Sequence, residues 1–197
     1  MTLARDDKLG LYRKMLLVRR MEEKHADLLK AGQMWIMGHF GTGQEAVSIG
    51  VTAPLAKDDY LFPTHRGVGE FIGKGMSPKN IWAEYYGRAA SPCHGKGGMH
   101  LADAGVGILG LVGSLGADYC VAVGTALSAK MRGSKQVTLY YFGDGTSNEA
   151  DFHPAMNLAA LWKLPIVFAC AYNHFSELAY TSETTATKDI APRAAGY

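Results

Sequence analysis

The run Val137-Thr138-Leu139-Tyr140-Tyr141-Phe142, followed by the turn Gly143-Asp144-Gly145, decides the fold of this chain. β-Branched and aromatic residues fill the run, which is typical of a buried strand. An aspartate between two glycines at the end of such a strand can reach a hard cation, while the glycines let backbone N–H groups approach phosphate oxygens closely. The stretch therefore predicts a strand that ends in a cradle for a metal ion and a diphosphate.

A second run of the same kind, 166–172, ends at Asn173, which follows Asp144 by 29 residues. This distance is about one loop, one helix and one strand. We predict a helix around 152–162 between strands at 137–142 and 166–172, which makes a βαβ unit. Parallel strands joined in this way end at the same edge of a sheet, so we expect the oxygen atoms of Asp144 and Asn173 to lie there on adjacent strands.

Further helices follow from apolar spacing and from residues that begin or end helices. Ser77 and Pro78 have the character of an N-cap and a first helical residue. Small residues that follow Ala117 indicate a helix that can pack closely. The predicted helices cover residues 6–31, 44–53, 78–86 and 117–133.

Composition excludes several classes of protein. The chain of 197 residues is 48% hydrophobic and has a net charge of +2, so it can bury one substantial core but has no basic footprint for nucleic acid. No apolar run approaches the ~20 residues that span a membrane. Three cysteines without a paired spacing favour a reducing compartment. Because residues 1–10 lack a secretion or import pattern, we expect a cytoplasmic protein.

A glycine-aspartate-glycine turn alone is more often only a turn after a strand, but the surrounding residues change that interpretation. The segment from Gly143 to Asn173 resembles the thiamine-diphosphate motif. The residues within this segment resemble those of the α subunit of the E1 component of 2-oxo-acid and acetoin dehydrogenase complexes. The residues that carry this second likeness are Gly143 to Asn148, Phe152-His153, Met156 to Pro165, Gly43 to Ala46, Thr64 to Gly67 and Gly95 to His100.

The resemblance implies the α/β thiamine-diphosphate-binding fold, with three α/β/α layers around a mostly parallel sheet. Residues 1–197 are expected to form a single diphosphate-binding domain with an N-terminal helical extension at about 1–40. Related α subunits continue beyond the equivalent of Tyr197. We therefore expect the sheet to be incomplete at the C-terminal end.

The resemblance also implies a site for thiamine diphosphate and Mg²⁺, with Ca²⁺ as an alternative ion. The metal ligands would be the side chains of Asp144 and Asn173 and the backbone carbonyl of Phe175. Gly143, Gly145 and Thr146 would approach the diphosphate, helped by free N–H groups of a helix beginning near residues 146–149.

Two further pairs of residues receive cofactor-binding roles from the resemblance. Arg66 would bind the phosphates, although an arginine in a loop is by itself more often only a surface residue. His65 would steer substrate or assist proton transfer, and a structural histidine is an equal alternative. Gly113 would contact the aminopyrimidine and Leu115 would hold the cofactor bent, unless Leu115 is merely an apolar residue before a helix.

The implied activity is cleavage of acetoin, or decarboxylation of a 2-oxo acid such as pyruvate, with transfer of the acyl group to a lipoyl carrier. No catalytic residue is expected in this chain, because the carboxylate that activates the aminopyrimidine comes from a separate β subunit in this family. The expected partners are that β subunit in an α2β2 heterotetramer, a lipoyl-bearing E2 component and a small-molecule substrate. The alternative is a non-catalytic relative with an assembly or regulatory role.

Other patterns in the chain do not support a different site. The run Gly105 to Gly110 matches G-x-G-x-x-G, but it follows no convincing strand and has no acidic residue about 20 positions later. The spacings of the histidines form no recognised zinc pair. Ala171 and Tyr172 stand where related chains carry a polar pair, and Pro154 is expected to shift or kink the start of its helix.

Overall fold

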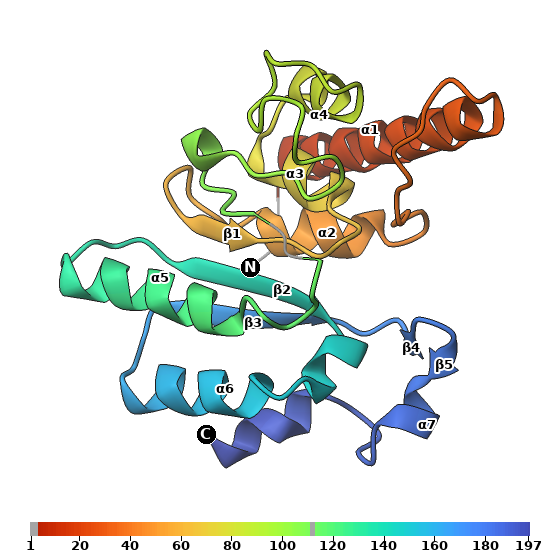
Figure 1. Ribbon diagram of the computed structural model, residues 1–197. Helices are drawn as coiled ribbons and strands as arrows, with labels where there is room; N and C mark the ends of the chain where they lie inside the picture. The colour runs from red at the N-terminus through yellow and green to blue at the C-terminus, as the bar shows by residue number, and fades with distance from the viewer. Residues whose placement is uncertain (1–3, 111–112) are drawn as a thin grey trace. The chain divides into compact units, whose positions relative to one another are not determined.

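The structure is a computed structural model that describes residues 4–110 and 113–197 (Figure 1). The chain divides into two compact units. The helical unit comprises residues 1–57 and 65–110, and the sheet unit comprises residues 58–64 and 111–197. The assignment of residues 1–197 to a single domain stays a prediction beside this division. None of the described helices has the length and apolar character needed to cross a membrane.

The helical unit confirms the three helices predicted for it. Its elements are α1 (Arg5–Lys30), α2 (Glu45–Thr52), α3 (Val68–Lys74), α4 (Pro78–Tyr85) and the 3₁₀ helix η1 (Ala104–Val106). The buried face of α1 carries Val18, Met21, Glu22 and His25, at helical spacing. At α4 the Ser77 side chain accepts a hydrogen bond from the Asn80 N–H, as expected of an N-cap.

Helix α3 was not predicted, because glycines at 69 and 73 lower its intrinsic helix propensity. Tertiary packing overrides this preference. A Cβ atom on Gly69 would lie 2.1 Å from Ser48 Oγ, and one on Gly73 would lie 1.9 Å from Thr52 Oγ1. The glycines therefore allow α2 and α3 to approach closely.

The sheet unit contains the predicted βαβ unit and a third parallel strand. Its elements are β1 (Tyr60–Phe62), α5 (Tyr119–Met131), β2 (Thr138–Gly143), η2 (Gly145–Asn148), α6 (Phe152–Leu161), β3 (Ile166–Ala171), β4 (Phe175–Ser176), β5 (Ala179–Tyr180), α7 (Thr181–Thr184) and η3 (Ala191–Gly196). The order of the parallel sheet is β1-β2-β3 (Figure 1). The strands β4 and β5 form a separate antiparallel hairpin.

An aromatic cluster joins β2 to the helices that cover one of its faces. Tyr140 and Phe142 of β2 pack with Tyr119 of α5 and Phe152 of α6. The Tyr140 hydroxyl donates to Asp118 Oδ1 at 2.6 Å, which satisfies the one polar atom that this ring brings into the core. This packing fixes the direction in which β2 reaches the turn at Asp144.

The helix predicted to begin near residues 146–149 is a short one. The chain after Asp144 forms the short 3₁₀ helix η2, and α6 begins only at Phe152. Pro154 is the third residue of α6, where its missing N–H has no partner within the helix, so it is tolerated in the first turn.

We predict that Gly69→Ala lowers the free energy of unfolding by about 1–3 kcal/mol, because the added methyl group overlaps Ser48. Gly50→Ala is the matched control, since a Cβ atom at this exposed position of α2 meets no atom within 4 Å. That variant is expected to be neutral or up to about 1 kcal/mol more stable. Denaturant unfolding measures both, and equal effects of the two substitutions would contradict the packing argument.

Candidate functional site

Asp144 follows β2 directly and is buried, with 1% of its surface exposed. Its Oδ2 accepts a hydrogen bond from the Thr181 hydroxyl. Its backbone carbonyl accepts from the Ser147 side chain at 2.6 Å and from the Ser147 N–H at 3.1 Å. Within residues 4–110 and 113–197, nothing donates a hydrogen bond to Oδ1. One oxygen of a firmly held carboxylate thus retains its full acceptor capacity.

Asn173 lies at the same edge of the sheet as Asp144. The pairing of β2 with β3 aligns Gly143 with Ala171, so both strands end together. Thr181 connects the two ends, because its N–H donates to the His174 carbonyl at 2.9 Å while its hydroxyl reaches Asp144. The backbone register therefore confirms that the two strands end at the same edge of the sheet.

The Phe175 carbonyl belongs to the hairpin that follows Asn173. The Phe175 N–H donates a hydrogen bond to Asn173 Oδ1 at 3.0 Å. The bond from the Thr181 N–H to His174 marks Phe175 and Tyr180 as a non-hydrogen-bonded pair of the antiparallel ladder. The Phe175 carbonyl is consequently outside that ladder. Its role as a metal ligand stays a prediction.

The three predicted ligands are a carboxylate, a carboxamide and a carbonyl, which are the donor types that a hard cation such as Mg²⁺ or Ca²⁺ takes. Asn173 Oδ1 retains a second lone pair after its bond to Phe175. Across the described part of the chain, no group of three His, Cys, Asp or Glu side chains is placed to hold a metal ion. The predicted site is of a different kind, since only one of its donors belongs to these residue types.

The two glycines of the turn have different roles. A Cβ atom on Gly145 would lie 2.3 Å from Ser176 Oγ, so this glycine lets the β4–β5 hairpin pack against the turn. A Cβ atom on Gly143 would meet nothing closer than Thr146 Oγ1, at 3.9 Å. Gly145 is thus required by local packing. The close approach of a phosphate to Gly143, Gly145 and Thr146 stays a prediction.

Arg193 supports the same turn and was missed by the sequence analysis. Its Nη1 donates to the Ser147 carbonyl at 2.7 Å and its Nη2 donates to Asn148 Oδ1 at 2.9 Å. Its guanidinium also lies over the Phe152 ring, 5.7 Å from the ring centre. No local pattern singles out this arginine, because its partners lie more than 40 residues earlier in the chain.

Gly113 and Leu115 lie in an exposed turn before α5, and 40% of the Leu115 surface is accessible. The turn is held beside η2, since Gly116 has φ +87° and a Cβ atom there would lie 2.7 Å from Glu149 Cβ. An exposed leucine on a constrained turn is compatible with an apolar contact to a cofactor. The roles of Gly113 and Leu115 stay predictions.

Arg66 and His65 belong to the helical unit. Arg66 Nη1 donates to the Phe40 carbonyl at 2.6 Å. The His65 ring lies edge-on to His39, with ring centres 4.9 Å apart. Burial, with smaller contributions from the charges of Arg66, His39 and His100, lowers the pKa of His65 to about 4. His65 is therefore neutral near pH 7, which does not favour a role as a proton donor in this state.

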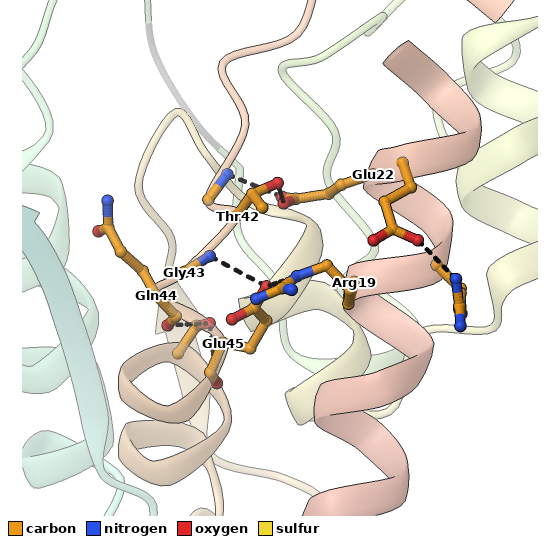
Figure 2. A network of polar contacts seen from close by, with 10 residues as sticks. Arg19, Glu22, Thr42, Gly43, Gln44 and Glu45 are labelled. Atoms are coloured by element: carbon orange, nitrogen blue, oxygen red, sulfur yellow. Dashed lines mark hydrogen bonds and ion pairs between the residues drawn. The ribbon is translucent and has the colours of Figure 1, made fainter. Parts of the chain in front are cut away.

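The segment 40–45, whose Phe40 carbonyl accepts from Arg66, is anchored by the buried side chains of Glu22 and Glu45 (Figure 2). Glu22 accepts from the Gly41 N–H and the Thr42 hydroxyl, both at 2.8 Å, and burial raises its pKa. Glu45 pairs with Arg19 at 2.6 Å and accepts from the Gly43 N–H at 3.1 Å. Burial acts to raise the pKa of Glu45, but these hydrogen bonds outweigh it and hold the pKa below its ordinary value.

This network supplies a physical reason for the run Gly43 to Ala46, which the sequence analysis used only for its resemblance. Buried carboxylates at 22 and 45 were not identified from the sequence. In α1 Glu22 shares its face with apolar residues, and this position is the signal that marks it as buried.

Comparisons with known proteins place the chain among dehydrogenases. The family model described as "Dehydrogenase E1 component" matches residues 13–197. The α subunit of acetoin:2,6-dichlorophenolindophenol oxidoreductase from Bacillus subtilis is 40% identical, over 100% of this chain and 60% of that protein. The pyruvate dehydrogenase E1 component α subunit from Rhizobium meliloti is 35% identical, over 98% of this chain and 56% of that protein.

A comparison of structures agrees on the fold. An X-ray structure from Mycobacterium smegmatis, described as that of a thiamin diphosphate-dependent enzyme, matches with a TM-score of 0.53 and 20% identity. The match covers 78% of this chain and 25% of that one, and at this identity it shows the fold alone. The α/β fold predicted from the sequence is thereby confirmed. The chain spans about three-fifths of the length of the curated relatives with which it was compared.

We predict that the free energy of unfolding falls as the pH is lowered from about 6.5 to about 4, in part because of His65. An unfolded histidine takes up its proton near pH 6.5, whereas folded His65 does so only near pH 4. Its stabilisation is thus present above pH 6.5 and is lost across this window. His25 acts in the same direction, because burial lowers its pKa as well.

In His65→Gln, the loss of free energy of unfolding between pH 6.5 and pH 4 should be smaller by on the order of 1 kcal/mol, a value reduced for solvent screening. His153→Gln, at an exposed position, is the control and should leave the slope unchanged. Denaturant unfolding at several pH values measures the slope. An unaltered slope in His65→Gln would show that His65 titrates normally.

Proposed function

The chain belongs to the dehydrogenase E1 component family, and from this premise we propose that it forms part of the α subunit of a thiamine-diphosphate-dependent dehydrogenase. The substrate is acetoin or a 2-oxo acid such as pyruvate, and the acyl product passes to a lipoyl carrier. The observation that carries the proposal is the common end of β2 and β3 at Gly143 and Ala171, after which Asp144 and Asn173 follow at one edge of the parallel sheet.

The described residues fit the proposed cofactor. Asp144 Oδ1 receives no hydrogen bond from the described residues, and Asn173 and Phe175 add two further oxygen donors. Asp144 is buried, and a buried carboxylate that pairs with a cation avoids most of the cost of desolvation. We propose Asp144, Asn173 and the Phe175 carbonyl as ligands of Mg²⁺, with Ca²⁺ as the alternative ion.

The remaining residues are proposed to bind and orient the cofactor. Gly143, Gly145 and Thr146 supply backbone N–H groups to the diphosphate. Thiamine diphosphate supplies the carbanion chemistry when bound. Arg66 contacts phosphate with a guanidinium that the Phe40 carbonyl already orients, and neutral His65 offers a hydrogen bond rather than a charge.

Acetoin is the preferred substrate in this proposal. The acetoin-type α subunits of Bacillus subtilis and Cupriavidus necator are 40% and 39% identical to the chain, and the pyruvate-type subunits of Rhizobium meliloti and Homo sapiens are 35% and 38% identical. The proposed partners are a β subunit in an α2β2 assembly, which contributes the missing catalytic carboxylate, and a lipoyl-bearing E2 component. A cytoplasmic location stays a prediction.

We predict that Asp144→Ala weakens binding of thiamine diphosphate with Mg²⁺ by about a hundredfold or more, because loss of a direct ligand exceeds the usual effect of an outer-shell change. Isothermal titration calorimetry of the protein together with its β subunit measures the affinity. Asp151→Ala, an exposed aspartate of the same unit, is the control and should bind normally. Wild-type protein that does not bind, or binding indifferent to Asp144→Ala, would refute the cofactor site.

The same preparation tests the substrate through reduction of 2,6-dichlorophenolindophenol. We expect faster reduction with acetoin than with pyruvate. The opposite order would assign the chain to the pyruvate type. Binding of the cofactor without reduction by acetoin or any 2-oxo acid would instead favour a non-catalytic relative.

A further inference from the structure

Thr181 makes the one hydrogen bond that reaches the Asp144 side chain from the described residues. It is the first residue of α7, and only 3% of its surface is exposed. The hydroxyl donates its single proton to Asp144 Oδ2, so the direction of this bond is determined by chemistry. The bond to Oδ2 restricts rotation of the Asp144 carboxylate, and Oδ1 stays available as an acceptor.

The position of Thr181 does not depend on its own hydroxyl. The N–H of Thr181 bonds to His174 at 2.9 Å, and its carbonyl accepts from the Thr185 N–H at 2.8 Å. The preceding hairpin packs through Ser176 onto Gly145. These contacts hold the start of α7 beside the β4–β5 hairpin (Figure 1).

A second group of contacts fastens the segment after Thr181 to η2. Asn148 Nδ2 donates to the Thr184 carbonyl and to Thr185 Oγ1, both at 3.0 Å. Arg193 bonds to Ser147 and Asn148 from further along the chain. The segment therefore closes around the turn at several points, and removal of one hydroxyl leaves the other contacts in place.

We propose that Thr181 is a positioning residue for the metal site: its hydroxyl fixes the Asp144 carboxylate through Oδ2 and leaves Oδ1 as the metal ligand. The inference rests on the proposed function, in which Asp144 binds Mg²⁺. Outer-shell hydrogen bonds of this kind orient metal ligands and typically change metal affinity by about 10–100-fold.

The test uses Thr181→Val, Thr181→Ser and the matched control Thr184→Val. Valine keeps the shape of threonine without the hydroxyl, and serine restores the hydroxyl. Thr184 lies in the same short helix, is exposed, and its hydroxyl bonds only to carbonyls of its own turn, at 180 and 181. Calorimetric titration with Mg²⁺ at saturating thiamine diphosphate, in the assembled protein, measures the affinity.

Thr181→Val is expected to weaken Mg²⁺ binding by about tenfold or more. Thr181→Ser should stay within about threefold of wild type, and Thr184→Val should be unchanged. Wild-type affinity or tighter binding in Thr181→Val would overturn the proposal. If Thr181→Val does not fold, Thr181→Ala decides by the same criterion.

A double-mutant cycle of Thr181→Val and Asp144→Ala, read by denaturant unfolding without metal, separates this proposal from the proposed function. The two substitutions should be non-additive if the contact exists. Coupling in a protein that binds no cofactor would count against the proposed function alone. Full additivity would count against the positioning role of Thr181 itself.

Discussion

The parallel pairing of β2 with β3 is the constraint on which the rest of the candidate site depends. Its register ends both strands together, at Gly143 and Ala171. A slip of one residue would turn every side chain of a strand to the other face, so the buried aromatic residues on β2 hold the register. Because Tyr140 and Phe142 are packed against α5 and α6, Asp144 has little freedom in where it emerges.

Polar groups are restrained in a different way in each of the two units. At the sheet edge, short-range contacts between the turn and the segment after β3 restrain one carboxylate through a hydroxyl and leave its other oxygen for a ligand. In the helical unit, buried glutamates bind backbone N–H groups and hold a loop that carries the partner of Arg66. In each unit, buried polar groups restrain the local geometry through hydrogen bonds.

The fold and the common end of strands β2 and β3 were predictable from the sequence, and most of the contacts around that end were not. Periodic apolar residues and the Ser77 cap marked the long elements because these signals are local. Helix α3 was not predicted, because its glycines have low helix propensity and the helix depends on close packing against Ser48 and Thr52. The same reason applies to three side chains that were not predicted, those of Glu22, Thr181 and Arg193. Each forms hydrogen bonds with residues 19–46 positions away, and no pattern of spacing in the sequence indicates such contacts.

We have proposed that Asp144, Asn173 and Phe175 together bind the metal ion that holds the diphosphate. A crystal structure of the protein with its β subunit, Mg²⁺ and thiamine diphosphate would test this assignment. We expect Mg²⁺ about 2.0–2.1 Å from Asp144 Oδ1, Asn173 Oδ1 and the Phe175 carbonyl, with Thr181 still bonded to Oδ2. A metal ion bound elsewhere, or a diphosphate bound without contact between Asp144 and the metal, would contradict it.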